Sequence, residues 1–151
     1  MIPEFTLVPY IGAKPVTFEM TAADVEQILG PAETVGVNDL GERDERRGPM
    51  NIRYSLDDGK VVEIVFDPMA SLLYQGNNLL NETALVDFLL RFDDQPFEFV
   101  GFLIFLDLGI TATGFHDDDE AQKSIMVFRR GRLDGFRDDF SVYSKAGRHE
   151  G

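Results

Sequence analysis

Apolar and polar residues alternate over much of this chain, and a period of two residues is typical of β-strands with one buried face. The alternation is clearest from Lys60 to Phe66, and a second strand is expected from Met50 to Leu56. Between them stands Asp57-Asp58-Gly59, and an Asp-Gly pair favours the tight turn of a β-hairpin. These residues therefore predict a hairpin in the first half of the chain.

Two short segments have instead the three- and four-residue spacing of helices. Thr21 and Asp24 predict a capping box at the start of the first helix, and Gly30-Pro31 predicts its end. A second helix is expected to start near Glu82, with Asn81 as its cap. The apolar positions of this second helix have the spacing of a face that packs on a core: Leu85, Phe88, Leu89 and Phe92.

Two longer stretches favour opposite environments. The nearly continuous apolar run from Phe97 to Leu106 predicts a central strand buried on both faces. The charged stretch 38–49 has no period, and it predicts an exposed, mobile loop. Further extended segments are expected at 3–20, 32–37 and 72–74, a second hairpin at 110–115 and 124–130, and an edge element at 133–143.

Each half of the chain thus repeats one order of elements, a short helix followed by a hairpin that turns on aspartates. We therefore predict an α+β fold, with a curved antiparallel sheet of about six to eight strands packed by two short helices. One domain is expected over residues 1–151, a length that suffices to bury a core. It would contain two similar helix-plus-hairpin units at about 3–76 and 77–143 and a tail at 144–151.

The composition narrows the classes of function. The chain has no cysteine, which excludes disulfides, thiolate nucleophiles and cysteine-bound metals. Its net charge of −13 argues against nucleic acid, because binding to phosphates depends on clustered Lys and Arg. We find neither the pattern of a secretory leader nor an apolar run of about 20 residues, so a cytoplasmic protein without a membrane segment is expected.

The first helix belongs to a longer recognisable stretch, which reads Phe18-Glu19-Met20-Thr21-Ala22-Ala23-Asp24-Val25-Glu26-Gln27-Ile28-Leu29-Gly30-Pro31. This stretch resembles the first unit of the β-lactamase inhibitor protein family and of the small outer-membrane assembly lipoproteins. The resemblance implies tandem helix-plus-sheet units and, for the inhibitors, binding to another protein. The chain departs from both families, because it has neither disulfide cysteines nor an acylated cysteine. It also looks like small uncharacterised bacterial proteins of the immunity type.

One cluster has the composition of a cation site: His116, Asp117, Asp118, Asp119 and Glu120. Adjacent acids point alternately apart, however, and their spacing matches no EF-hand loop. We therefore expect an exposed hairpin tip without a metal ion, and we expect no cofactor. The sequence contains neither a Gly-x-Ser-x-Gly elbow nor a phosphate-binding loop, so no catalytic residue is assigned.

The arginines of Arg129-Arg130-Gly131-Arg132 could bind an anion, but a cluster of salt bridges at the end of a strand is the favoured interpretation. The segment 77–120 is strongly acidic, with Arg91 as its only basic residue. Such an acidic face attracts a basic partner and speeds their encounter. The partner predicted from charge is therefore a basic protein.

The function expected from the sequence is non-enzymatic protein binding, of the inhibitor or immunity type, through a rigid sheet face. Two alternatives stay open. One is a small-ligand binder or enzyme that uses a pocket between the two units. The other is a structural homo-oligomer, such as a homodimer whose exposed edge strands pair. A deep pocket with converging polar groups would favour the first alternative, whereas a broad exposed aromatic patch would favour the protein binder.

Overall fold

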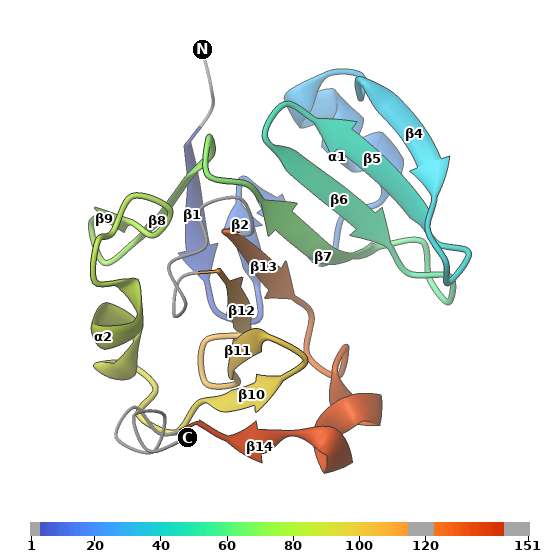
Figure 1. Cartoon of the computed structure of the whole chain (residues 1–151). Helices are drawn as coiled ribbons and strands as arrows, with labels where there is room; N and C mark the ends of the chain where they lie inside the picture. The colour runs from blue at the N-terminus through green and yellow to red at the C-terminus, as the bar shows by residue number, and fades with distance from the viewer. Residues whose placement is uncertain (1–3, 115–122, 144–151) are drawn as a thin grey trace.

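The computed structural model describes residues 4–114 and 123–143. Within these ranges the chain forms fourteen strands in two sheets, two α-helices and one 3₁₀ helix, so the fold is α+β as predicted (Figure 1). The strands outnumber the six to eight expected for two reasons. Several strands are only two residues long, and the stretches 38–49 and 97–106 contain strands and a turn that the sequence did not indicate.

The larger sheet has nine strands in the order β14-β10-β11-β12-β13-β7-β6-β5-β4, and every neighbouring pair is antiparallel. The two halves of the chain meet in its middle, where β7 pairs with β13. The strands are β4 (Thr34–Val37), β5 (Arg43–Arg47), β6 (Met50–Tyr54), β7 (Val61–Phe66), β10 (Phe97–Phe99), β11 (Phe102–Phe105), β12 (Ile110–Thr113), β13 (Ser124–Phe128) and β14 (Ser141–Val142).

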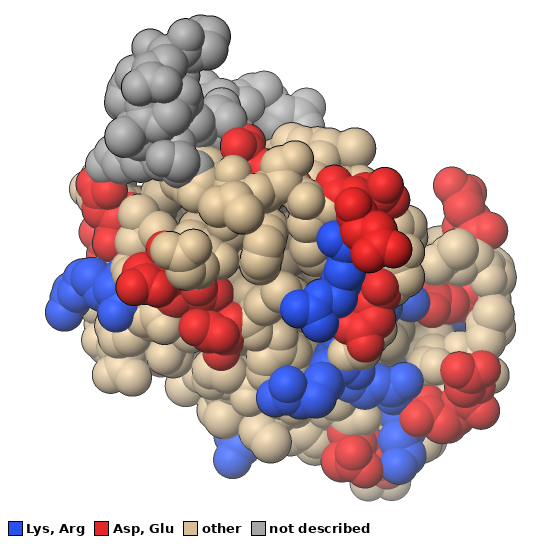
Figure 2. Space-filling model, turned by 90° about the horizontal axis from the view of Figure 1, so that it is seen from below, with Lys and Arg blue, Asp and Glu red and all other residues tan. Residues whose placement is uncertain are grey.

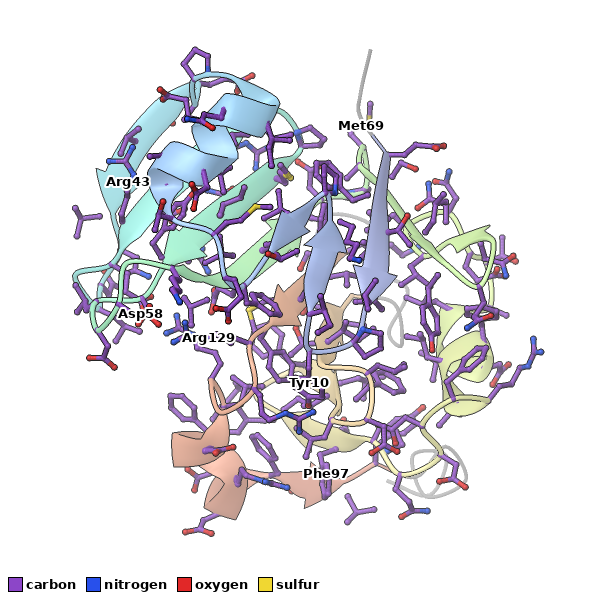
Figure 3. All side chains as sticks on the ribbon, turned by 180° about the vertical axis from the view of Figure 1, so that it is seen from behind. Tyr10, Arg43, Asp58, Met69, Phe97 and Arg129 are labelled. Carbon is purple, nitrogen blue, oxygen red and sulfur yellow. The ribbon has the colours of Figure 1, made fainter. Side chains whose placement is uncertain are left out.

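The smaller sheet has the order β3-β2-β1-β8-β9, and its β1–β8 pair is parallel. Seen from behind, its first strands and α1 lie in front of the larger sheet (Figure 3). Phe5 of β1 contacts Phe66 of β7 in the core, with ring centroids 5.5 Å apart. The strands are β1 (Glu4–Val8), β2 (Gly12–Lys14), β3 (Val16–Thr17), β8 (Ser71–Tyr74) and β9 (Asn77–Asn78).

Helix α1 (Ala22–Leu29) begins and ends where the sequence predicted. The Asp24 N–H donates to Thr21 Oγ1 and the Thr21 N–H donates to Asp24 Oδ2, which together form the capping box. Gly30 follows the helix with a φ of 82°, a conformation that is costly for residues with a side chain. Val25 is buried and holds the helix to the core.

Helix α2 (Leu85–Leu90) begins later than expected, and its N-cap is Ala84 without a side-chain hydrogen bond. The prediction that Asn81 caps this helix is therefore wrong. The predicted apolar stripe is confirmed: Leu85 and Leu89 are buried, and Phe88 and Phe92 pack against the core.

Two predictions from long stretches are also wrong. The stretch 38–49 is not an exposed loop, because it contains strand β5, in which Glu45 and Arg47 are buried. The run 97–106 is not one central strand. It is a hairpin of β10 and β11 with Val100 and Gly101 in its turn, near the β14 edge of the sheet. An apolar run alone does not show where the chain reverses.

The predicted internal repeat would relate α1 and the β6–β7 hairpin to α2 and the strands β12 and β13. All of these elements are present, and the similarity of the two units stays a prediction. In the described part of the chain, no helix combines the length and apolar character that a membrane crossing requires.

Candidate functional site

The predicted hairpin tip from His116 to Glu120 lies outside the described residues. Its expected exposure and lack of metal therefore stay predictions. Within residues 4–114 and 123–143, no group of three or more His, Asp or Glu side chains is arranged to hold a metal ion. The candidate sites are instead a charged hollow beside β13 and an aromatic patch near β14.

Strand β5 alternates its charged side chains between the two faces of the larger sheet. On one face the Glu45 carboxylate is fully enclosed, and it accepts hydrogen bonds from Arg47 Nε at 3.1 Å and from the Tyr54 hydroxyl at 2.8 Å. Arg47 also donates to the carbonyl of Gly30, which fixes the end of α1 to the sheet. Burial, together with the negative Glu45, raises the pKa of Tyr54.

On the other face, charged side chains and one amide, that of Asn51, form a continuous hydrogen-bonded chain, which we call the charge ladder. Its members, in order of contact, are Asp67, Arg46, Asn51, Asp44, Arg53, Glu63, Arg132 and Glu42. Arg132 closes the ladder from beyond β13, with its Nε 2.7 Å from Glu63 and its two Nη atoms on Glu42. The ladder explains how a strand rich in charge occupies the interior of a sheet, since every charge meets its opposite.

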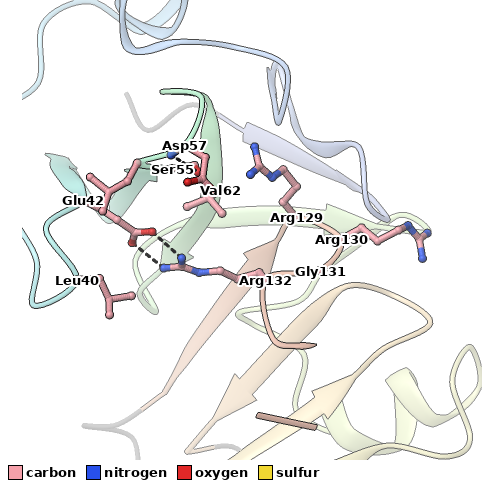
Figure 4. A pocket seen from close by; sticks show the side chains of 10 residues that line it. Leu40, Glu42, Ser55, Asp57, Val62, Arg129, Arg130, Gly131 and Arg132 are labelled. Carbon is pink, nitrogen blue, oxygen red and sulfur yellow. Dashed lines mark hydrogen bonds and ion pairs between the residues drawn. The ribbon is translucent and has the colours of Figure 1, made fainter. Parts of the chain in front are cut away.

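The end of the ladder forms one wall of a hollow of about 490 Å³ (Figure 4). The residues around it are Leu40, Glu42, Ser55, Leu56, Asp57, Val62 and the segment 129–132. The prediction of salt bridges at this arginine cluster is confirmed, because Arg129 pairs with Asp58 at 3.0 Å and Arg132 pairs with Glu42 and Glu63. The Arg130 guanidinium lies over the Tyr10 ring, 4.0 Å from its centroid.

These contacts decide what the hollow can do chemically. Hydrogen bonds from Arg132 hold the pKa of Glu42 below its usual value, and burial opposes them without reversing the effect. A carboxylate with a low pKa and both oxygens bonded to a guanidinium is a poor proton acceptor. Arg132, with its pKa raised by the same hydrogen bonds, has its charge already neutralised. Two of the three arginines around the hollow, Arg129 and Arg132, are thus held in ion pairs, and the third, Arg130, is held against the Tyr10 ring.

The aromatic patch lies near the opposite edge of the sheet, where β10, β11 and β14 meet the 3₁₀ helix η2 (Asp134–Asp139). We call it the phenylalanine patch. Phe99 contacts both Phe136 and Phe140 with ring centroids 5.6 Å apart, and Phe97 contacts Phe140 at 5.9 Å. The members that are most exposed are Val100, Phe102, Phe136 and Val142.

The strand register explains why these rings gather. Phe97 and Phe99 lie two positions apart, so they share one face of β10, and Phe102 on β11 is the cross-strand partner of Phe99. The segment after β13 returns along this face as η2 before the chain pairs as β14 with β10. Phe136 and Phe140, four positions apart, meet the rings of β10 from this segment.

Val100 occupies a costly position at the tip of the β10–β11 hairpin. It has a φ of 42° and Gly101 has a φ of 87°, so both central residues of this two-residue turn are left-handed. Asn and Gly suit such a turn, whereas a β-branched residue is strained there. Val100 is also 74% exposed, so no core packing offsets the strain. A strained and exposed apolar residue is a candidate for a binding site.

Acidic groups border the patch. Asp134, Asp138 and Asp139 on η2 are exposed, and Arg137 is the basic residue among them, 3.9 Å from Asp134 in a solvent-exposed pair. Figure 2 looks onto this end of the molecule from below and shows uncharged surface beside acidic groups, with basic groups among them. The patch therefore has an apolar centre and a rim with more negative than positive charge, on a chain whose net charge is −13.

Sequence reasoning did not find the phenylalanine patch, because it assigned Phe97 to Leu106 to a buried strand. Two features of the sequence could have indicated the patch: the Val100-Gly101 pair, and the spacing of Phe136 and Phe140. Comparison of the chain with models of known protein families, with curated proteins and with solved structures gave no match.

Proposed function

We propose that the protein is a non-enzymatic binding module that docks a basic protein partner on the phenylalanine patch. The observation that carries the proposal is the exposed aromatic surface itself, with Phe102 and Phe136 partly in solvent beside Val100 and Val142. Contiguous apolar surface with a polar rim is typical of protein interfaces, and aromatic side chains often provide most of the binding energy.

The rim suggests the chemistry of the partner. Exposed aspartates on η2 would meet Lys or Arg side chains, and the charge of the whole chain would attract a basic protein from a distance. The inhibitor or immunity type of function fits this arrangement, since such proteins act by covering a surface of their target. This finer assignment rests on the charge and on the resemblance of the stretch 18–31.

The small-ligand alternative would use the charged hollow, and the pairing of Arg129 and Arg132 weakens it. A ligand that bound Arg132 there would have to displace the ion pairs that satisfy the buried Glu42 and Glu63, at a cost of several kcal/mol. The phenylalanine patch needs no such displacement. Protein binding is therefore the function that the described residues support best.

The experiment is affinity capture from an extract of the native host with the immobilised protein, followed by binding measurements with each purified captured protein. Phe136→Ser removes an exposed aromatic of the patch, and Met69→Ser is a matched control, because Met69 is exposed far from the patch (Figure 3). We expect a basic protein whose affinity falls about tenfold or more with Phe136→Ser and is unchanged with Met69→Ser.

Salt gives a second readout. If acidic rim groups steer a basic partner, the association rate should fall steeply as NaCl is raised. The proposal is wrong if Phe136→Ser and Met69→Ser bind the captured protein equally well, or if that protein is acidic and its association rate does not depend on salt.

A further inference from the structure

The other end of the larger sheet carries an unprotected edge. Among the residues that the structure describes, strand β4 is the terminal strand of this sheet and pairs on one side only, with β5. Its four residues, Thr34-Val35-Gly36-Val37, are all exposed, and they include neither a charged residue nor a proline. Proteins normally protect an exposed edge with charges, prolines, bulges or very short strands, because free backbone N–H and C=O groups pair readily with another strand.

The remaining edge strands in the described residues are protected by their length. Strands β14, β3 and β9 end the sheets elsewhere, and each has only two residues. Such short strands offer little backbone for pairing. Strand β4, with four uncharged residues, is the edge where another chain could add a strand.

A mostly apolar hollow of about 380 Å³ lies beside this edge, and its lining also includes Arg43, whose charge is met by Glu45 at 2.8 Å. Val35 and Val37 contribute to it from β4, and Leu56 contributes from the turn between β6 and β7. The two valines are two positions apart and thus share one face of the strand. Val37 is 71% exposed and Leu56 is 67% exposed, so each offers apolar surface to an incoming chain. An added strand could place every second side chain against this surface.

The charges beside β4 select the kind of strand. Glu33 directly precedes the strand, Asp39 follows it after Asn38, and both acids are exposed. If a second copy paired with β4 about Gly36, Glu33 of each chain would come near the Asp39 of the other, just beyond the ends of the paired strands. Like charges directly opposite each other destabilise strand pairing, and two chains of net charge −13 repel. Basic residues at both ends of the incoming strand would instead meet opposite charges.

We propose that β4 binds an extended segment of a partner protein, with apolar residues at alternate positions and Lys or Arg at both ends, as an additional strand of the larger sheet. Backbone hydrogen bonds to β4 would provide affinity, and the hollow beside Val35 and Val37 would select the apolar side chains. This site lies at the β4 end of the sheet, whereas the phenylalanine patch lies near β14. The two proposals therefore stand or fall separately.

The test uses a fluorescent synthetic peptide of seven residues, in which valine and threonine alternate between a lysine at each end. Fluorescence anisotropy measures the binding of this lysine peptide and of two variants of it, one with glutamate at both ends and one with alternate backbone nitrogens methylated. The binding of the lysine peptide is also measured with two variants of the protein. Val37→Lys places a charge on the edge of β4, and Met69→Lys is the exposed control far from β4. Because both residues lie in solvent, neither variant should disturb the fold.

We expect the lysine peptide to bind about tenfold more tightly than the glutamate peptide, and Val37→Lys to weaken its binding by about tenfold or more. Met69→Lys should leave binding unchanged, the methylated peptide should not bind, and the bound peptide should slow hydrogen exchange at the amides of β4. Equal binding of the methylated peptide, or no binding of the lysine peptide at millimolar concentration, would overturn the proposal. A concentration-dependent dimer that Val37→Lys abolishes would also overturn it, because β4 would then pair with a second copy.

Discussion

Arg132 and Glu42 lie 90 positions apart in the sequence, yet both Nη atoms of the arginine contact the two carboxylate oxygens of the glutamate, at 2.6 and 2.7 Å. This bidentate contact joins the segment after β13 to the hairpin of β4 and β5, and Arg132 Nε extends the contact to Glu63. A two-pronged geometry of this kind is the strongest that arginine forms with a carboxylate. It joins the two halves of the chain on the face of the larger sheet that carries the charge ladder.

Replacement of Arg132 should therefore be costly. Arg132→Met leaves Glu42 buried without a counter-charge and leaves Glu63 with Arg53 as its remaining partner, and loss of one member of a buried ion pair typically costs about 3–5 kcal/mol. The free energy of unfolding from urea titration measures the loss. Arg137→Met is the control, because Arg137 pairs with Asp134 in solvent and should contribute less than about 1 kcal/mol. Similar losses in both variants would contradict the prediction.

The Glu42 contact also makes stability depend on pH. Hydrogen bonds from Arg132 hold the pKa of Glu42 in the folded protein below its value of 4.5 in the unfolded chain. The unfolded chain therefore takes up the proton first, so the contribution of Glu42 is complete above about pH 4.5 and is lost as the pH falls through the folded pKa. Urea titrations of the wild type and of Glu42→Gln at about pH 7 and about pH 3 measure the effect. The stability difference between the two proteins should shrink at the lower pH; a constant difference would show that Glu42 is not the titrating group.

The sequence predicted local features well, because neighbouring residues determine them. The capping box of Thr21 and Asp24, the helix end at Gly30 and the turn after Tyr54 all depend on contacts within a few positions. Strand β5 could not be predicted in this way. Its charged side chains are stable in the sheet only because of β6, β7 and Arg132, and these partners are not visible in its own sequence.

The same limit applies to the candidate sites. The exposed surface of the phenylalanine patch depends on how η2 returns along β10, and the edge of β4 is exposed because β4 ends the sheet. A period of apolar residues predicts that a face is buried or exposed, but not which strand lies at an edge. The sequence did predict a strand at 32–37, and it left open the pairing of exposed edges.

Two residues of the apolar stripe of α2 should contribute different amounts to the free energy of unfolding. Leu89 is fully buried, and Leu89→Ala should lower the free energy of unfolding by about 2–5 kcal/mol. Phe88 is only partly buried, against Phe92 at 5.2 Å, so Phe88→Ala should cost less than Leu89→Ala, contrary to the order of their side-chain sizes. Thermal and urea unfolding of the two variants would measure the order. A larger loss in Phe88→Ala would show that its ring is more deeply packed than its exposure indicates.

Metal addition tests the predicted hairpin tip from His116 to Glu120, which rests on the sequence alone. Calcium, magnesium and zinc should leave the melting temperature nearly unchanged, whereas an ion at 100 times its dissociation constant would stabilise the fold by about 2.7 kcal/mol. The comparison with Asp118→Asn decides the origin of any rise. If a sub-millimolar ion raises the melting temperature by several degrees and Asp118→Asn abolishes the rise, the cluster is a metal site.

A substitution of Val100 should change stability and binding in opposite directions. Its left-handed conformation at the tip of the β10–β11 hairpin is strained for valine and favourable for asparagine, so Val100→Asn should raise the free energy of unfolding by about 1 kcal/mol. Val142→Asn is the control, because Val142 is exposed in the same patch but lies in strand β14 and should not gain stability.

The same variant should weaken binding of the captured partner, because it removes an exposed apolar side chain from the phenylalanine patch. The valine at this exposed tip lowers the stability of the fold, and no packing in the core compensates for the loss. Such a loss is expected where the side chain is needed for binding. Urea titration and a binding titration on the same preparation of Val100→Asn give both quantities. Higher stability with unchanged affinity would place Val100 outside the interface, and lower stability would show that the turn is not strained.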